Sequence, residues 1–138
     1  MTNLIEITLE EEGYVSQSNA RLTESAKHTV TIERLLEDWH AFAQEVEEGY
    51  NWTSYEYAND LSTREILDEV MAEAPTTLRD KLRRVLEEPD ARFYAATREI
   101  DRAIGFGMTK KTRPLWFRIP KRLCPELEND LRARGLLD

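Results

Sequence analysis

The chain has 138 residues, of which 41% are hydrophobic and 33% charged, and its formal net charge at pH 7 is −8. This length and composition predict a single globular domain over residues 1–138 with its own hydrophobic core. One cysteine excludes an internal disulfide, and no apolar run approaches the roughly 20 residues that cross a bilayer. Because the first residues also lack the basic start and apolar core of a signal peptide, we expect a cytoplasmic protein that does not bind membranes.

Charge is divided unevenly along the chain. Residues 1–78 carry 17 acidic and 4 basic side chains, a net charge of −13, whereas residues 79–138 carry 10 acidic and 15 basic ones, a net charge of +5. An acidic surface repels the phosphates of nucleic acid and attracts a basic protein. The composition therefore favours a protein partner.

The N-terminal residues show the alternation of a strand. Over Leu4–Leu9 the apolar residues Ile5, Ile7 and Leu9 alternate with the polar residues Glu6 and Thr8. This alternation predicts a short, half-buried strand. A second strand around Tyr14 is a weaker alternative, because the residues that surround it have turn composition.

A helix is predicted between Thr31 and Gly49. Its apolar residues recur at helical spacing, namely Ile32, Leu35, Leu36, Trp39, Phe42, Ala43 and Val46. Thr31 is a suitable N-cap, and Gly49 is a suitable C-terminal stop. Since most of the remaining positions are acidic, this helix should present a strongly negative surface opposite its buried side.

The segment Gly49–Asp60, GYNWTSYEYAND, combines four aromatic residues with acids and lies between two predicted helices. A helix should follow it, because Ser62 and Glu65 have the spacing of a capping box. That helix should end near Glu73, where an Ala-Pro sequence interrupts it.

Two further helices are predicted over Thr77–Glu87 and Asp90–Ile104, with Pro89 separating them. A strand is predicted over Leu115–Ile119 and is expected to pair with the N-terminal strand. A last helix should cover Pro125–Arg134. The chain is therefore predicted to be mainly α, with about five helices and a minor β element, and an α+β arrangement is the alternative.

Motifs that could carry catalysis or bind a metal are incomplete. Glu37-x-x-His40 has the spacing found in carboxylate-bridged diiron bundles, but a second such motif is missing. Cys124 could act as a nucleophile only with His28 or His40 beside it, and packing is the commoner role of a lone cysteine. The glycines and lysines of residues 105–111 lack the spacing of a phosphate-binding loop. We therefore expect no metal, no cofactor and no enzymatic activity, and an enzyme that uses Glu37 and His40 is an alternative.

A basic stretch lies in the second half. Between residues 102 and 122 there are seven basic residues and no acid: Arg102, Lys110, Lys111, Arg113, Arg118, Lys121 and Arg122. With Phe106, Trp116 and Phe117 nearby, this stretch could bind nucleic acid. We favour the alternative that it neutralises the acidic half within the fold or across a dimer, because the rest of the molecule would repel phosphate.

The aromatic acidic segment is the best candidate for a binding surface. Burial of at least two of its four rings is expected, because amphipathic rings often cover a hydrophobic face. In an extended chain Tyr55 and Tyr57 would share one side, and an exposed pair among acids would anchor a basic partner. The candidate partner-binding residues are Glu37, Asp38, Glu45, Glu48, Tyr50, Trp52, Tyr55, Glu56, Tyr57 and Asp60.

In its length, acidity and lack of catalytic motifs, the chain resembles the small cytoplasmic immunity proteins that bacteria encode beside toxins. Residues 55–66, YEYANDLSTREI, are similar to the toxin-facing region of colicin-nuclease immunity proteins, which are acidic and helical but shorter. The resemblance implies tight, one-to-one binding of a cognate toxin domain. The alternative is a regulatory or adaptor module, such as a homodimer in which acidic and basic halves meet.

Overall fold

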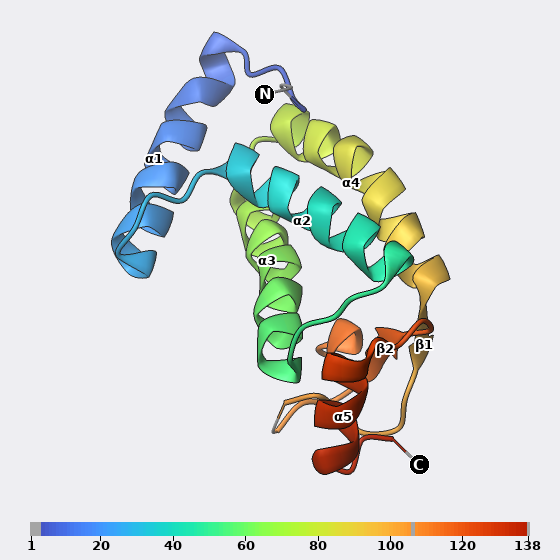
Figure 1. Cartoon of the computed structure of the whole chain (residues 1–138). Coiled ribbons are helices and arrows are strands. Elements are labelled where there is room, and N and C mark those ends of the chain that lie inside the picture. The colour runs from blue at the N-terminus through green and yellow to red at the C-terminus, as the bar shows by residue number, and fades with distance from the viewer. Residues whose placement is uncertain (1–3, 106, 138) are drawn as a thin grey trace.

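The computed structural model describes residues 4–105 and 107–137. Within these ranges the chain forms five α-helices and a small two-stranded sheet, so the prediction of a mainly α fold with a minor β element is confirmed. The elements are α1 (Leu9–Ala26), α2 (Ile32–Glu48), α3 (Ser54–Glu73), α4 (Thr76–Ala96), β1 (Thr97–Glu99), the 3-10 helix η1 (Pro114–Phe117), β2 (Arg118–Pro120) and α5 (Pro125–Ala133). Figure 1 shows α2, α3 and α4 packed together, with α1 to one side and α5 and the sheet at the opposite end.

Helix α2 has the predicted boundaries. The Thr31 hydroxyl caps it by accepting the backbone N–H of Arg34 at 3.1 Å. Gly49 ends it with a φ of 132°, which glycine adopts far more readily than other residues. All seven predicted core residues of this helix are buried.

An aromatic cluster lies at the centre of the core. Around Phe42 of α2 stand four other rings with centroid distances between 5.4 and 5.9 Å: Trp39, Tyr50, Tyr57 and Phe93. These rings meet at tilted or edge-to-face angles, which are the favourable geometries for aromatic pairs. The cluster joins α2, α3, α4 and the segment between α2 and α3.

The predicted N-terminal strand is wrong. Residues 4–8 have no regular structure, and α1 begins at Leu9, so Tyr14 is helical as well. The Thr8 hydroxyl accepts the backbone N–H of Glu11, and the Glu11 carboxylate accepts that of Thr8. This capping box, with three glutamates in the first turn where the helix dipole favours negative charge, outweighs the short alternation before it.

Helix α3 begins eight residues before the predicted capping residue, Ser62. Thr53 is the N-cap and accepts the backbone N–H of Glu56, so residues 54–60 of the aromatic acidic segment are helical and the predicted helix start at Ser62 is wrong. Ser62 lies inside the helix and donates to the carbonyl of Asn59. Two Ser/Thr-x-x-Glu sequences compete as helix starts here, and the first one forms the cap. The predicted end at Glu73 is confirmed.

Helix α4 continues through Pro89, so the prediction of two helices separated by this proline is wrong. Proline removes one helical hydrogen bond, which is a local cost. Pro89 itself is buried, and the next residue, Asp90, accepts hydrogen bonds from Trp39 of α2 at 2.8 Å and from Arg64 of α3 at 2.9 Å. These contacts hold α4 against α2 and α3 at the residue directly after the proline.

The sheet pairs β1 with β2 in antiparallel orientation. The opposed residues are Thr97 with Pro120, Arg98 with Ile119 and Glu99 with Arg118. The predicted pairing with the N-terminal residues is therefore wrong, as is the extension of the preceding helix to Ile104. The strand predicted over Leu115–Ile119 is only partly correct, because its first residues form η1. Two hydrogen bonds hold η1 in place, since the backbone N–H groups of Ile100 and Ile104 donate to η1 carbonyls at 2.8 Å.

Helix α5 begins at Pro125 and ends at Ala133, with Arg134 as its C-cap, close to the predicted range. It holds the start of α3. The Asp130 carboxylate accepts the backbone N–H of Ser54 at 2.6 Å, and the Arg134 guanidinium donates to the Ser54 hydroxyl at 2.7 Å. This contact fixes the position of the first turn of α3, which carries part of the candidate site.

Polar contacts fasten both ends of α1. Glu11 is only 1% exposed and accepts hydrogen bonds from Lys81 at 2.7 Å and Thr77 at 2.6 Å, both on α4. The Tyr14 hydroxyl donates to the carbonyl of Val70 on α3 at 2.6 Å. The bonds near the other end join Asn19 to Ile32 and Thr23 to Val30. Between these two sets of bonds, α1 lies beside α3 in antiparallel orientation (Figure 1).

Acid should loosen α1. Hydrogen bonds from Lys81, Thr77 and the Thr8 backbone lower the pKa of Glu11 from 4.5 to about 2. Since the folded pKa lies below the unfolded one, ionised Glu11 stabilises the fold fully above pH 4.5 and loses this effect as the pH falls toward 2. We expect hydrogen-exchange protection of the α1 amides, measured relative to α2, to fall over that range. This acid-dependent step should be missing in Glu11→Gln, and identical pH profiles in the two proteins would show that Glu11 does not fasten the helix.

Candidate protein-binding site

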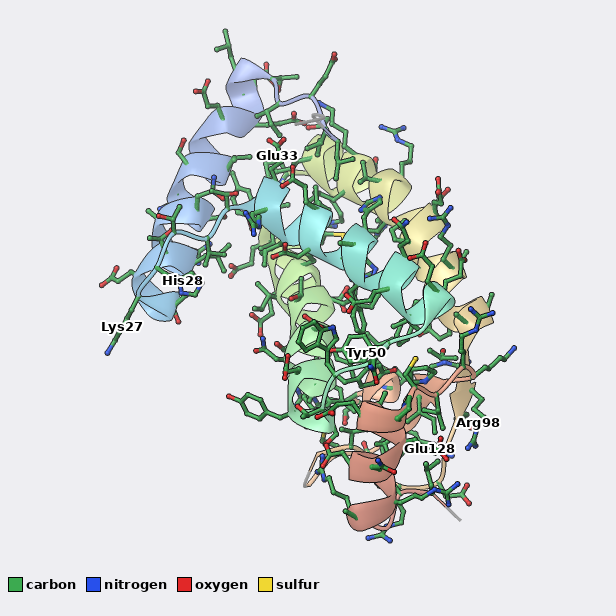
Figure 2. The ribbon with its side chains drawn as sticks, in the orientation of Figure 1. Lys27, His28, Glu33, Tyr50, Arg98 and Glu128 are labelled. Atoms are coloured by element: carbon green, nitrogen blue, oxygen red, sulfur yellow. The ribbon has the colours of Figure 1, made fainter. Side chains whose placement is uncertain are left out.

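The ten candidate residues lie on α2, in the segment that connects α2 to α3, and in the first two turns of α3. Two of them belong to the core, because Tyr50 is 1% exposed and Tyr57 is 0% exposed. Figure 2 shows Tyr50 inside the molecule beside α3. The expectation that at least two of the four rings are buried is confirmed, and these two rings support the surface from beneath.

The two exposed rings are Trp52 and Tyr55, with exposures of 51% and 81%. The Trp52 ring is oriented by a hydrogen bond from its Nε1 to the Glu45 carboxylate. Tyr55 and Tyr57 are two positions apart on a helix, which places them on opposite sides of α3. The two tyrosines therefore do not share one side, as they would in an extended chain.

The Tyr50 hydroxyl donates to Asp60 at 2.8 Å, and the charges of three other carboxylates act on Asp60. Burial raises the pKa of Asp60, and the neighbouring charges of Glu45, Asp38 and Glu56 raise it further, while the hydrogen bond from Tyr50 lowers it. Burial and the Asp60 carboxylate likewise raise the pKa of the Tyr50 hydroxyl. The structure thus brings together four of the acids singled out in the sequence.

We call this set the acidic aromatic surface: Asp38, Glu45, Trp52, Tyr55, Glu56 and Asp60. The two other candidate acids, Glu37 and Glu48, are not among the groups that shift the pKa of Asp60. Glu48 accepts a hydrogen bond from Gln44 one turn earlier at 3.2 Å. Asp38 is the one member of the surface that has an ion-pair partner in the described ranges, Arg34 at 3.1 Å.

Replacing Asp60 by asparagine should stabilise the fold at neutral pH. The folded pKa of Asp60 is raised above 3.8, so the ionised carboxylate costs stability above that pKa, and the cost disappears as the pH falls below 3.8. Asparagine keeps an acceptor for Tyr50 and removes the repulsion, so we expect a gain of about 0.5 kcal/mol in urea unfolding at pH 7. The gain should vanish near pH 3. Asp80→Asn, at an exposed position on α4, is the control, and an equal gain there would show that the effect is not local.

Most of the basic stretch is bonded inside the molecule. Five of its seven members have an acceptor in the described ranges: Arg102 with Gly135, Lys110 with Glu99, Arg113 with Glu65, Arg118 with Thr97 and Arg122 with Glu48. Trp116 and Phe117 are buried, and Phe106 lies outside the described residues. On α4, Arg79 binds the last carbonyls of α3, and Lys81 binds Glu11. Only two of the five acceptors are carboxylates, Glu99 and Glu65, and the other three are backbone carbonyls, so among the described residues of the stretch Arg113 alone pairs with an acid of residues 1–78.

Cys124 is not brought together with His28 or His40. The His40 ring bonds to the carbonyl of Leu36 at 2.8 Å. His28 lies at the end of α1, away from α5 (Figure 2), whereas Cys124 directly precedes α5 and lies beside Gly49. Gly49 is nine residues beyond His40, about 13 Å along the helix axis. Residues 4–105 and 107–137 contain no group of three or more His, Cys, Asp or Glu side chains that could hold a metal ion.

Sequence reasoning missed a groove next to the acidic aromatic surface. Two depressions, of about 520 and 630 Å³, adjoin each other between α1 and α3 and share Leu22, Ser25, Ile66 and Glu69. The second depression also reaches Asp38 of the acidic aromatic surface. A signal for this groove was available in the helical spacing of Asn59, Ser62, Ile66, Glu69 and Glu73, but α1 was not recognised as a helix.

No protein-family model, no curated protein and no solved structure matches this chain. Within the part of the chain that the structure describes, no helix combines the length and apolarity required to span a membrane.

Proposed function

We propose that this protein is a non-enzymatic, cytoplasmic inhibitor that neutralises a basic protein by direct binding, and that the partner is a cognate bacterial toxin domain. The acidic aromatic surface is the binding face. The resemblance of residues 55–66 to the toxin-facing region of immunity proteins supports this choice of partner.

The observation that carries the proposal is the exposure of two large rings among carboxylates. Tyr55 is 81% exposed and Trp52 51% exposed, so both rings are free to contact a partner. Glu45 orients the Trp52 ring, and Glu56 follows Tyr55 on the same exposed turn. Aromatic anchors surrounded by complementary charge are the residues that contribute most to protein interfaces.

Charge and rings would act at different stages of binding. Four interacting carboxylates attract a basic protein from a distance and accelerate the encounter, an effect that salt weakens. The rings then lose contact with water in the complex and slow its dissociation. Because the carboxylates repel one another in the free protein, a cationic partner also relieves a cost that the free fold bears.

Co-expression with the protein encoded by the adjacent gene tests the proposal. We expect a one-to-one complex by size-exclusion chromatography with light scattering, and loss of the partner's activity in the complex. The double variant Tyr55→Ala and Glu56→Lys should weaken binding by about 100-fold or more, because it removes the more exposed ring and reverses the acid next to it.

A matched control is the double variant Tyr94→Ala and Glu87→Lys on α4, which removes another exposed tyrosine and reverses another exposed acid. Its affinity should stay within about threefold of the unmodified protein. A chain that forms no complex with a basic neighbour, or that instead dimerises with itself, would refute the inhibitor proposal and favour the regulatory alternative. Equal losses in both double variants would refute the binding face.

A further inference from the structure

The groove between α1 and α3 is lined by apolar residues at its base and polar residues along its edges. Leu22 of α1 and Ile66 of α3 belong to both depressions, and Val70 extends the base toward the end of α3. All three side chains pack against the core from one side. We call this feature the α1–α3 groove.

One face of α3 connects the groove to the acidic aromatic surface. Tyr55, Asn59, Ser62, Ile66 and Glu69 follow one another at alternating intervals of four and three residues, which places them in one stripe along the helix. The last four line the groove. Tyr55 continues the same stripe beyond the end of the groove. A partner bound to the acidic aromatic surface can therefore extend along α3 into the groove.

The charge that the groove leaves unpaired is negative. Its two arginines already have partners, since Arg21 pairs with Glu73 at 3.6 Å and Arg34 with Asp38 at 3.1 Å. In the described ranges Glu69 has no ion-pair partner. The end of the groove near Asp38 meets the acidic aromatic surface, where Asp60 and its neighbours repel one another. A ligand with cationic side chains would thus find one unpaired acid, Glu69, in the middle of the groove and the acidic aromatic surface beyond one end.

We infer that the α1–α3 groove receives an amphipathic, cationic helix of the partner protein, with its apolar residues on Leu22 and Ile66 and its basic residues toward Glu69 and Asp38. This inference rests on the proposed function, because it assigns the groove to the same partner. Burial of the apolar face provides affinity, and the position of the acids selects a basic sequence.

The walls of the groove favour a helix over an extended strand. Most of the lining comes from helices α1, α2 and α3, whose backbone N–H and C=O groups bond within each helix, and residues 28–30 close one end. An extended segment needs a free sheet edge to pair with, and the groove offers none in the described ranges. A helix brings its own backbone bonds and places apolar residues at the same three- and four-residue intervals as the stripe on α3.

A synthetic peptide tests the inference without the natural partner. The probe is an 18-residue amphipathic helix of leucine and lysine carrying a fluorescent label, and a leucine and glutamate helix of the same length is its counterpart. We expect fluorescence anisotropy to show binding of the lysine peptide that weakens with salt, and no binding of the glutamate peptide. Equal binding of both peptides would contradict the charge assignment.

Two variants of the chain locate the binding. Ser25→Trp fills the groove from an exposed position on α1, and Ser16→Trp is its control, because nine residues at about 100° each place it on the opposite side of the helix. Glu69→Lys reverses the unpaired charge, and Glu87→Lys makes the same change on α4. We expect Ser25→Trp and Glu69→Lys to weaken binding of the lysine peptide by about tenfold or more. The two control variants should weaken it by less than about twofold.

The outcomes separate this inference from the proposed function. If Ser25→Trp and Glu69→Lys bind the lysine peptide as tightly as their controls, the groove inference is wrong, and the co-expression test of the acidic aromatic surface still stands. If the peptide does not bind at low salt, the groove inference is likewise wrong. If the peptide binds in the groove but the adjacent gene product forms no complex, the proposed function fails, and the groove keeps its cationic ligand. Circular dichroism of all four variants confirms that each is folded.

Discussion

Replacing Asp90 by alanine should lower the free energy of unfolding by about 3 kcal/mol. The Asp90 carboxylate accepts bonds from Trp39 of α2 at 2.8 Å and from two nitrogens of Arg64 of α3 at 2.9 Å. It is therefore the one point at which a single side chain of α4 is bonded to both neighbouring helices in the described parts of the chain. Alanine would leave the Arg64 side chain, which is 15% exposed, without its main counter-charge. Asp68 still pairs with Arg64 at 2.6 Å, which keeps the loss at the lower end of the range for broken buried pairs.

Urea denaturation of four further variants, which include Arg64→Met alone, separates charge from hydrogen bonding at this position. Asp90→Asn keeps an acceptor for Trp39 and should cost less than Asp90→Ala. Arg64→Met combined with Asp90→Ala should cost less than the sum of the single changes, because the two side chains act as one unit. Glu87→Ala, on the exposed side of the same helix, should change stability by less than about 0.5 kcal/mol. Additive losses for the double variant would mean that Arg64 and Asp90 contribute separately.

Local signals in the sequence were sufficient for α2 and α5. Thr31, Gly49 and Pro125 act on the backbone within a few residues of themselves, so their effects do not depend on the rest of the fold. The stripe of buried residues in α2 is long and regular. Because this stripe fixes which side of α2 is buried, it also fixes which side is exposed and acidic. Asp38 and Glu45 could therefore be placed on the surface from the sequence.

The errors arose where distant residues decide local structure. Pro89 remains helical because Asp90 binds two other helices, and β1 pairs with residues about twenty positions later rather than with the N-terminus. Neither pairing has a local sequence signal. At Thr53, by contrast, the capping signal is local. Ser62 and Glu65 show the same capping-box spacing, however, so the sequence alone does not decide which of the two positions begins α3.

The candidate site was predictable only in part for the same reasons. Its composition was visible in the sequence, but the division into exposed and buried rings depended on whether residues 54–60 are helical. The groove depends on the position of α1, which is fastened by Glu11. In sequence Glu11 is one of three consecutive glutamates, and nothing local distinguishes the one that is buried against Lys81.

Replacing Phe42 by alanine should be the most destabilising single change considered, with a loss of about 4 kcal/mol. The Phe42 side chain is buried and touches four other rings, so its removal leaves a cavity that none of the neighbours can fill without leaving its own contacts. Two of those rings, Tyr50 and Tyr57, also hold polar groups in place. Tyr50 donates to Asp60, and Tyr57 donates to the carbonyl of Arg118, each at 2.8 Å. The loss of stability should therefore be accompanied by faster amide exchange in the first turns of α3.

Tyr55→Ala is the natural comparison, because it removes a ring of similar size from the neighbouring helix. With 81% of Tyr55 exposed, its loss should change the free energy of unfolding by less than about 0.5 kcal/mol, while Phe42→Leu, which keeps part of the buried volume, should lose about 1.5 kcal/mol. Urea titrations at pH 7 measure all three. A large loss for Tyr55→Ala would place that ring in the core and remove it from the binding face. A small loss for Phe42→Ala would mean that the aromatic cluster does not support the acidic aromatic surface. The expected pattern, a stable Tyr55→Ala that no longer binds the partner, would assign these two neighbouring aromatic side chains to binding and to folding respectively.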